Sequence, residues 1–264
     1  MKKLKRIVIA GSGNVAEALA RALAGSEEYT VVQVFARNPE RGRTVAALAG
    51  CAWENRPERL AEADVCLLAV SDKAIAELSA GLDFGGALVA HTSGSCGTDE
   101  LSNGIPRRGV FYPLQTFTAG RPVDFREIPL FIEAADEADY AVLYDLAASL
   151  SGSVYRSDAL LRRKMHVAAV FVCNFVNDLY AAGEQWMEAN GMDFSVLKPL
   201  IAETTRKMLD SPSPRSVQTG PAVREDWPTI EKHLQLLENC PDLQHIYDVL
   251  TRHIIQVKKT DGKL

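Results

Sequence analysis

A glycine-rich turn near the amino terminus carries the clearest chemistry in the sequence. It lies between the apolar run RIVIA and the helical pattern EALARALAG, and it reads GSGNVA, residues 11–16. The first glycine suits a tight turn, the second lets the backbone approach a pyrophosphate, and alanine at the end lets the helix pack on the strand. The helix start also offers unpaired N–H groups to phosphates. The pattern predicts a dinucleotide site whose contacts are Gly11, Ser12, Gly13, Asn14 and Val15.

The end of the second apolar run indicates which dinucleotide binds. A site for NAD carries Asp or Glu there to hold the ribose hydroxyls, but this sequence has Arg37 and Asn38. Arg37, helped by Asn38 and Arg41, suits a 2′-phosphate and can stack on adenine. The sequence therefore predicts NADP as the cofactor. The alternative is that Arg37 is a solvated surface residue.

Two more loops follow apolar runs. One contains Val70 and Ser71, and the other contains Thr92 and Ser93. In an open parallel sheet, ligands bind at the loops that follow the carboxyl ends of the strands. We therefore expect these four residues to contact the cofactor, with the alternative that Ser71 and Thr92 only cap helices or form turns.

A long helical segment supplies the catalytic candidates. Winding it at about 100° per residue groups Arg163, His166 and Asn174 on one side. The other side, with Phe171 and Phe175, is expected to pack in a helical core. A histidine titrates near neutrality, so His166 and Asn174 could protonate and orient a C=O or C=N group as hydride arrives. The alternative is that they are polar groups satisfied at an interface.

The elements that would position these residues change in character along the chain. Strand candidates are RIVIA, TVVQVFA, DVCLLAV, ALVAHTS, GVFYPL, PLFIEA and SVYRS. Continuous apolar character in several of them predicts a parallel sheet covered on both faces, which is the α/β class with a Rossmann-type domain. We place that NADP-binding domain at residues 1–157 and an all-helical domain for substrate and dimerisation at residues 158–264.

The helical part has its own start and stop signals. The long helix is expected to begin after Asp158 and to end at Gly191. A second helix follows Asp193, with Pro199 just beyond its first turn, where it could bend the helix. Further helices are expected from Asp226 and Asp242.

Composition narrows the function classes. A net charge of −5 argues against nucleic acid and anionic membranes as partners. The five cysteines are odd in number and form no CxxC pair, and the five histidines are scattered, so neither disulfides nor a metal site is predicted. A reducing cytoplasm fits best, and no apolar run reaches the roughly 18 residues of a membrane span.

Several segments together resemble a family of bacterial proteins that join a Rossmann-like domain to an all-helical domain. They are GSGNVA, HTSGS, PLQTF at residues 113–117, KMHVAAVFVCN at residues 164–174, and GPAVRED at residues 220–226 followed by Ile230 and His233. The family is related to pyrroline-5-carboxylate reductase and to deazaflavin-dependent NADP oxidoreductases. The resemblance implies a helical domain like that of 6-phosphogluconate dehydrogenase, NADP as cofactor, and a homodimer. It also marks a departure, because Tyr112 stands where the family usually has histidine, and a phenol is a poor base at pH 7.

Two functions follow from these observations. The first is an NADPH-dependent oxidoreductase that reduces a small C=O or C=N substrate between the domains. There His166 would be the acid, with Asn174, Ser93 and Tyr112 as orienting groups. The alternative is an NADP-binding sensor or partner-binding module without turnover.

Overall fold

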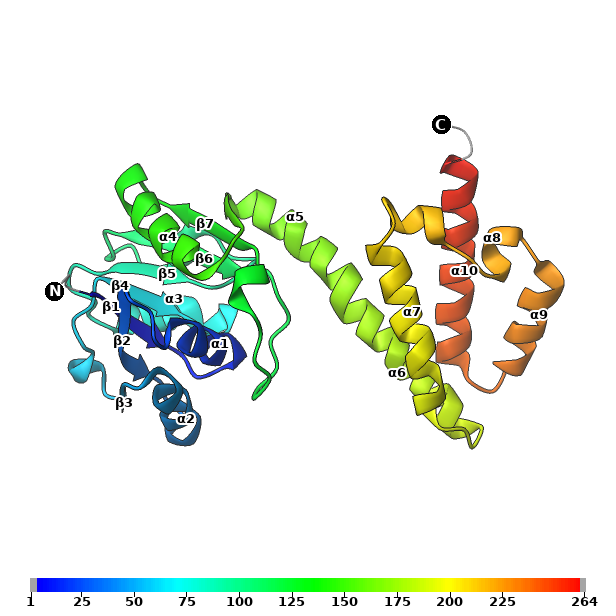
Figure 1. Ribbon diagram of the computed structural model, residues 1–264, viewed down its shortest axis with the longest axis horizontal. Helices are drawn as coiled ribbons and strands as arrows, with labels where there is room; N and C mark the ends of the chain where they lie inside the picture. Colours follow the sequence, from blue (N-terminus) through cyan, green and yellow to red (C-terminus); the bar gives the residue numbers. More distant parts are fainter. Residues whose placement is uncertain (1–3, 262–264) are drawn as a thin grey trace. The chain divides into compact units, whose positions relative to one another are not determined.

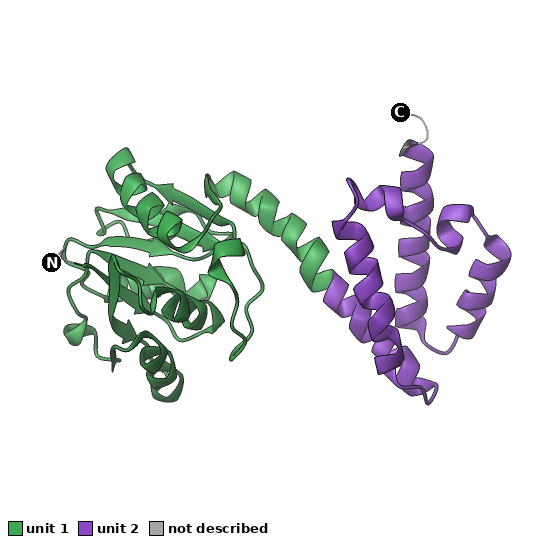
Figure 2. Ribbon diagram, viewed as in Figure 1, with its two compact units in different colours: residues 1–175 green, residues 176–264 purple. Residues whose placement is uncertain are grey.

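The computed structural model describes residues 4–261. The chain divides into two compact units, residues 1–175 and residues 176–264 (Figure 2). The first contains a sheet with its covering helices, and the second is helical (Figure 1). The predicted domain boundary between residues 157 and 158 stays a prediction.

The first unit is built on an eight-stranded sheet in the order β3-β2-β1-β4-β5-β6-β7-β8. Its strands are β1 Lys5–Ala10, β2 Tyr29–Phe35, β3 Ala52–Glu54, β4 Val65–Leu68, β5 Leu88–His91, β6 Arg108–Pro113, β7 Leu130–Ala134 and β8 Val154–Arg156. All seven predicted strands are present, and the Rossmann-type fold class is confirmed. The three-residue edge strand β3 was missed, and β7 runs antiparallel to β6 while the other pairs are parallel.

Two hydrophobic cores lie on opposite faces of this sheet. Alternate residues of β1 enter different cores: Ile7 and Ile9 pack in one, and Val8 and Ala10 pack in the other. Successive strand side chains point to opposite faces, so a strand covered on both sides must be apolar at every position. The uninterrupted apolar run RIVIA is explained by this double burial.

Three of the five α-helices of the first unit begin at a polar side chain that caps them. The five helices are α1 Asn14–Leu23, α2 Pro39–Ala49, α3 Asp72–Gly81, α4 Glu137–Leu150 and α5 Ala159–Ala169, with the short turns η1 Pro57–Arg59, η2 Thr98–Glu100 and η3 Phe125–Glu127. The side chains of Asn38, Asp136 and Asp158 accept a backbone N–H at the starts of α2, α4 and α5. Each such bond satisfies a donor that the helix itself leaves unpaired.

The long helix has an interruption that its sequence pattern did not predict. Asp158 caps its start, and Gly191, with a φ of +69°, follows its end, as expected. Between α5 and α6 Phe175–Ala189, however, residues Val170–Asn174 form a π-helix, η4. A π-turn inserts residues relative to the α-helical repeat. The winding of 100° per residue therefore fails between His166 and Asn174.

The second unit contains helices and turns only. After α6 come η5 Phe194–Leu197, α7 Lys198–Leu209, η6 Pro214–Val217, α8 Pro221–Arg224, α9 Trp227–Leu236 and α10 Pro241–Asp261. Asp226 caps α9, as predicted. Pro199 lies within the first turn of α7, and not beyond that turn as expected. In the first turn a backbone N–H has no partner inside the helix, so proline removes no hydrogen bond there. Pro199 therefore gives no reason for the expected bend.

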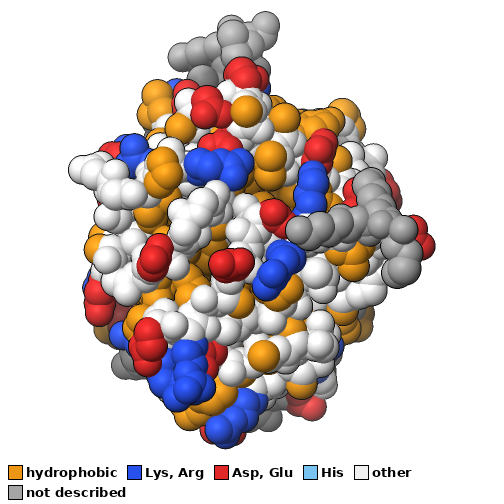
Figure 3. Space-filling model, turned by 90° about the vertical axis from the view of Figure 1, so that its left-hand side faces the viewer, with side chains coloured by type: hydrophobic (Ala, Val, Ile, Leu, Met, Phe, Trp, Pro, Cys, Tyr) orange, Lys and Arg blue, Asp and Glu red, His pale blue; other side chains and the backbone are white. Residues whose placement is uncertain are grey.

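Apolar side chains on the long helix are exposed. Phe171 and Phe175 are 62% and 50% exposed, so the expectation that they pack in a helical core of the same chain is wrong. No residue of α6 is buried. By length and composition, residues 159–189 are long and apolar enough to cross a membrane. On the face shown in Figure 3, by contrast, acidic and basic side chains are interspersed among apolar ones.

A buried carboxylate ties together the first two helices and a loop. Glu17 on α1 is 4% exposed and accepts from Arg21 at 3.1 Å, from Arg41 on α2 at 2.9 Å and from the backbone N–H of Gly120 at 2.9 Å. Burial by itself raises the pKa of Glu17, but these donors outweigh burial and hold the pKa below its ordinary value of 4.5. The ionised form is therefore stabilised by folding.

We expect Glu17→Gln to lower the free energy of unfolding at neutral pH by about 1–3 kcal/mol, because charge-assisted bonds become neutral ones. A lowered folded-state pKa gives stability that is complete above pH 4.5 and lost as pH falls through the folded value. The difference between wild type and variant should thus shrink toward acid pH. Urea unfolding at neutral and acid pH measures this. Glu77→Gln, an exposed change on α3, is the control, and a difference that grew on acidification would contradict the prediction.

Candidate functional site

The glycine turn joins β1 to α1 with the geometry that its sequence predicts. Gly11 has a φ of +134°, and a Cβ there would lie 2.1 Å from the carbonyl oxygen of Ala69. Gly13 caps α1, and a Cβ on it would meet nothing within 4 Å. Gly11 therefore makes the turn possible, and Gly13 leaves open space in front of the helix N-terminus. That open space fits a pyrophosphate held by backbone N–H groups.

Three loops gather at the same edge of the sheet. Because β1, β4 and β5 are adjacent and parallel, the residues that follow them meet at one edge. Val70 Cγ1 lies 3.3 Å from where a Cβ of Gly11 would be. Ser71 precedes α3 and makes no side-chain cap bond, so its hydroxyl is not used as a helix cap. The geometry brings Ser12, Gly13, Val70 and Ser71 together, and their contact with a cofactor stays a prediction.

The polar side chains around the glycine turn differ in how far they are already engaged. Asn14 donates its amide to the carbonyl oxygen of Phe117 at 2.8 Å, which fixes the loop after β6 against α1. Asn38 accepts the N–H of Arg41 as a helix cap, and Arg41 is held by Glu17. Arg37 is exposed and has no hydrogen bond or ion pair within residues 4–261. Of the two arginines considered for the 2′-phosphate, Arg37 is the one left available.

The loop after β5 is closed by its own side chains. Ser93 Oγ accepts the N–H groups of Ser95 and Cys96, each at 3.1 Å. Ser95 Oγ donates to Asp72 at 2.5 Å, which links the loop to α3. Thr92 Oγ1 lies 3.5 Å from the carbonyl oxygen of Leu68. The hydroxyls of Thr92 and Ser93 therefore hold the loop in shape, whatever they also contact.

A buried histidine fixes the base of the same loop. His91 is fully buried, and burial, with the nearby charge of Arg162, holds its pKa below the ordinary value. The neutral ring donates from Nε2 to the carbonyl oxygen of Gly97 at 2.9 Å and accepts the N–H of Ser93 at Nδ1 at 3.2 Å. Both ring nitrogens of His91 thus hold the backbone of the loop. The sequence indicated His91 only as the first residue of HTSGS and did not predict this structural role.

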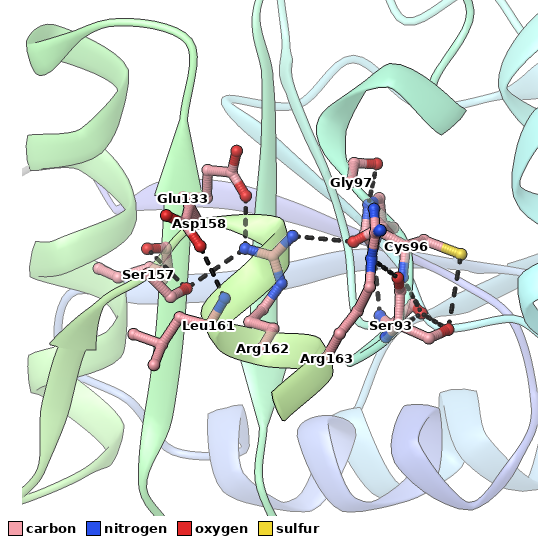
Figure 4. Close-up of polar contacts among 12 residues, drawn as sticks. Ser93, Cys96, Gly97, Glu133, Ser157, Asp158, Leu161, Arg162 and Arg163 are labelled. Carbon is pink, nitrogen blue, oxygen red and sulfur yellow. Dashed lines mark hydrogen bonds and ion pairs between the residues drawn. The ribbon is translucent and has the colours of Figure 1, made fainter. Parts of the chain in front are cut away.

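The start of α5 is attached to the sheet through a buried arginine. Arg162 is 0% exposed, and its guanidinium pairs with Glu133 on β7, donates to Ser157 Oγ at 3.3 Å and donates to the carbonyl oxygen of Cys96 at 2.8 Å (Figure 4). One side chain thereby joins α5, β7 and the loop after β5. The sequence did not predict this, because arginine is rarely buried without a partner that only the fold can bring to it.

Two of the predicted catalytic residues meet. Tyr112 near the end of β6 lies with its hydroxyl 3.3 Å from Nδ1 of His166 on α5, and the two rings are inclined at 66°. A Cβ on Gly94 would lie 2.5 Å from Cζ of Tyr112, so the phenol packs directly on the loop after β5. Burial and the charge of Asp72 raise the pKa of Tyr112. The tyrosine is therefore protonated at neutral pH and can act as a donor.

The third predicted catalytic residue is not part of this contact. Asn174 ends the π-helix and is exposed, and within residues 4–261 its side chain has no hydrogen-bond partner. Arg163 and His166 do share a face of α5, because they are three residues apart. No group of three or more His, Cys, Asp or Glu that could hold a metal ion exists among the described residues.

Two family models match the chain. Residues 6–92 match the model described as NADP oxidoreductase, coenzyme F420-dependent, and residues 128–254 match a domain of unknown function, DUF2520. A search of curated proteins gives no match.

Solved structures extend the comparison over the whole chain. A "putative NADP oxidoreductase" from Bacteroides fragilis is 38% identical, with a TM-score of 0.89, and the match covers 96% of this chain and 98% of that one. A pyrroline-5-carboxylate reductase from Coxiella burnetii is 15% identical over 96% and 99% of the chains, with a TM-score of 0.56. An imine reductase from a Pseudomonas species is 13% identical over 99% and 94%, with a TM-score of 0.58. At such low identity the last two share the fold only.

The two glycines should respond differently to alanine. We expect Gly11→Ala to lower the free energy of unfolding by about 2 kcal/mol or more, since the new Cβ would collide with the Ala69 carbonyl at a positive φ. Gly13→Ala should change the free energy of unfolding by less than about 1 kcal/mol. It should weaken the binding of NADPH at least about tenfold, because the new methyl group would enter the space for the pyrophosphate. Thermal unfolding and calorimetric titration measure both. Full NADPH affinity in Gly13→Ala would contradict the site.

Proposed function

The chain belongs to the family of the "putative NADP oxidoreductase" from Bacteroides fragilis, and from this premise we propose that it transfers hydride from NADPH to a small molecule with a C=O or C=N bond. Its membership makes it an NADP-dependent oxidoreductase. The observation that carries the proposed reaction is the hydrogen bond between Tyr112 and His166. It lies at the carboxyl end of β6, on the edge of the sheet where the glycine turn also lies.

The nucleotide would be held by the first domain. Open space at Gly13 and the start of α1 suits the pyrophosphate, and Val70 and Ser71 lie beside the same turn. Arg37, exposed and unpaired among residues 4–261, would bind the 2′-phosphate through its guanidinium. When bound, NADPH supplies the hydride that reduces the substrate carbon.

The proton that completes the reduction would come from the tyrosine and histidine. Tyr112 keeps its proton at neutral pH, since the ordinary pKa of a phenol is already 10.0 and burial raises it further, so its hydroxyl can donate to the substrate oxygen or nitrogen as charge develops there. His166 then returns a proton to the phenolate through Nδ1, and as an exposed residue it is reprotonated from solvent. Tyr112 is thus the immediate donor and His166 its proton source. This pairing offsets the low acidity of a phenol alone.

The remaining predicted residues differ in what supports them. Ser93 shapes the loop against which Tyr112 packs. A role for Asn174 in orienting the substrate stays a prediction, because its side chain is not part of the contact between Tyr112 and His166. The position of the substrate between the two domains stays a prediction. The cytoplasmic location also stays a prediction, supported by five cysteines that are all free thiols.

NADPH consumption with a panel of small aldehydes, ketones, 2-oxo acids and imines tests the proposed reaction. We expect Tyr112→Phe to lower kcat about 10²-fold to 10⁴-fold, the usual contribution of a positioned acid, with the Kd of NADPH unchanged. Arg37→Ser should reduce the preference for NADPH over NADH by about tenfold or more and leave kcat with saturating NADPH unchanged. Tight NADPH binding without turnover of any compound would favour the sensor function instead.

We also propose that the protein is a homodimer whose contact includes the long helix. Phe171, Val172 and Phe175 are 50–74% exposed, and contiguous apolar surface of this kind on a protein marks an interaction site. A second copy presents the same apolar stripe, so a two-fold contact would cover both at once. We therefore propose this apolar stripe as the contact surface of the dimer that the family resemblance implies.

Sedimentation equilibrium tests the dimer. We expect wild type to sediment as a dimer and Phe171→Glu to shift it toward monomer, because each copy would bury an unpaired carboxylate. Tyr144→Glu, which places the same charge on an exposed aromatic position of α4, is the control and should remain dimeric. A monomeric wild-type protein, or an unchanged dimer in Phe171→Glu, would contradict the proposed surface.

A further inference from the structure

Two consecutive arginines at the start of α5 have opposite surroundings. Arg162 is buried and paired with Glu133. Arg163 is exposed, and within residues 4–261 no carboxylate lies within ion-pair distance of it. The positive charge of Arg162 is thus neutralised inside the fold, whereas that of Arg163 is not. An arginine left in this state beside a candidate active site is available to an anionic ligand.

A hydrogen bond to the backbone orients the Arg163 guanidinium. Its Nε donates to the carbonyl oxygen of Ser95 at 3.1 Å (Figure 4). That bond uses one of the five guanidinium N–H groups and leaves the four on the two Nη atoms. A guanidinium fixed in this way loses less freedom when it binds a second partner. Paired N–H groups match the geometry of a carboxylate.

The guanidinium is next to the proposed proton donors. Arg163 lies three residues before His166, so the two side chains are neighbours on one face of α5. Its partner Ser95 belongs to the loop that packs on Tyr112, because a Cβ on the adjoining Gly94 would lie 2.5 Å from Cζ of the phenol. Arg163 and His166 on α5 and Tyr112 on β6 are therefore brought together at the loop after β5.

Asp72, the carboxylate that shares Ser95 with Arg163, is directed elsewhere. Asp72 Oδ2 accepts the hydroxyl of Ser95 at 2.5 Å, so Ser95 stands between Asp72 and Arg163. Asp72 also lies in the first turn of α3, where the helix N-terminus offsets negative charge. It does not neutralise the Arg163 fork. Its presence does disfavour a second negative charge on the same ligand.

We propose that Arg163 binds the carboxylate of the substrate, and that the substrates are monocarboxylates whose C=O or C=N carbon is next to that carboxylate: 2-oxo acids or 2-imino acids. This inference rests on the proposed reductase function. With the carboxylate on Arg163, the adjacent carbonyl oxygen or imine nitrogen is directed to Tyr112. Arg163 is thereby the residue that selects anionic over neutral substrates.

Calorimetric binding to the full-length protein saturated with NADP⁺ tests the proposal. The oxidised cofactor cannot reduce the ligand, so binding is measured whether or not the protein has turnover. The probes are 2-oxobutanoate and a five-membered cyclic 2-imino acid, each compared with its own amide. We expect at least one acid to bind about tenfold to 100-fold more tightly than its amide, as a charge-assisted pair of hydrogen bonds provides.

Two variants of neighbouring residues separate a specific contact from general charge. Arg163→Gln should lower the affinity for the acid to that for the amide, and it should leave the affinities for the amide and for NADP⁺ unchanged. Arg163→Lys, which keeps the charge but not the fork, should recover only part of the loss. Lys164→Gln removes the same charge one residue further along the helix and should change the acid affinity less than about twofold. Equal affinity of acids and amides in wild type, or an unchanged ratio in Arg163→Gln, overturns the proposal.

Turnover with NADPH distinguishes this failure from that of the proposed function. If acids bind through Arg163 but do not oxidise NADPH, the carboxylate site is supported and the reductase function is contradicted. If neutral ketones or imines are reduced rapidly and Arg163→Gln does not change the rate, the reductase function is supported and the carboxylate site is contradicted.

Discussion

An ion pair of a buried arginine sets the position of α5 on the sheet. Moving a guanidinium out of water is costly, and each of its polar atoms that gains a partner offsets part of that cost. Both Nη atoms of Arg162 are paired, with Glu133, Ser157 Oγ and the carbonyl oxygen of Cys96, while its Nε has no partner among residues 4–261. The partners come from β7, from the residue before Asp158 and from the loop after β5, so they fix the start of α5 against the sheet. The contacts of Arg163 and His166 further along α5 follow from it.

The loop after β5 is the second element on which the site depends. Its backbone is held by a neutral buried histidine at one end and by the hydroxyls of Ser93 and Ser95 in the middle. The same loop receives Arg162 and Arg163 from α5 and packs on Tyr112. A rigid loop shared by the sheet and the helix keeps polar groups from distant parts of the chain at constant separation. Catalytic groups need such fixed geometry.

The fold alone does not decide the chemistry. Pyrroline-5-carboxylate and imine reductases share it at 13–15% identity, and one fold commonly carries many activities. This chain pairs a tyrosine with a histidine, and among residues 4–261 it holds Arg163 without a carboxylate at ion-pair distance. Substrate selection would therefore depend on side chains at the end of β6 and on α5, while the glycine turn and α1 serve the cofactor.

Local features of this protein could be predicted from its sequence. The glycine turn, seven of the eight strands and the Asp158 and Asp226 caps depend on positive φ, hydrophobic period and short-range hydrogen bonds, and all of these involve residues close together in the chain. His166 and Tyr112 were chosen as chemical candidates on residue type and on the family resemblance. Strand β3 was missed although β8, which is equally short, was predicted, and the antiparallel direction of β7 is a property of pairing and not of its own residues.

The tertiary structure alone decided which side chains meet. Arg162 and Glu133 are 29 positions apart, and Tyr112 and His166 are 54 apart, so no local pattern links them. Their contacts exist because the order of strands in the sheet brings β6, β7 and the loop after β5 to the start of α5. The π-turn likewise changed the spacing that a regular helix predicts for Asn174. Sequence supplied the chemical groups and the local turns, and long-range packing chose the partners of those groups.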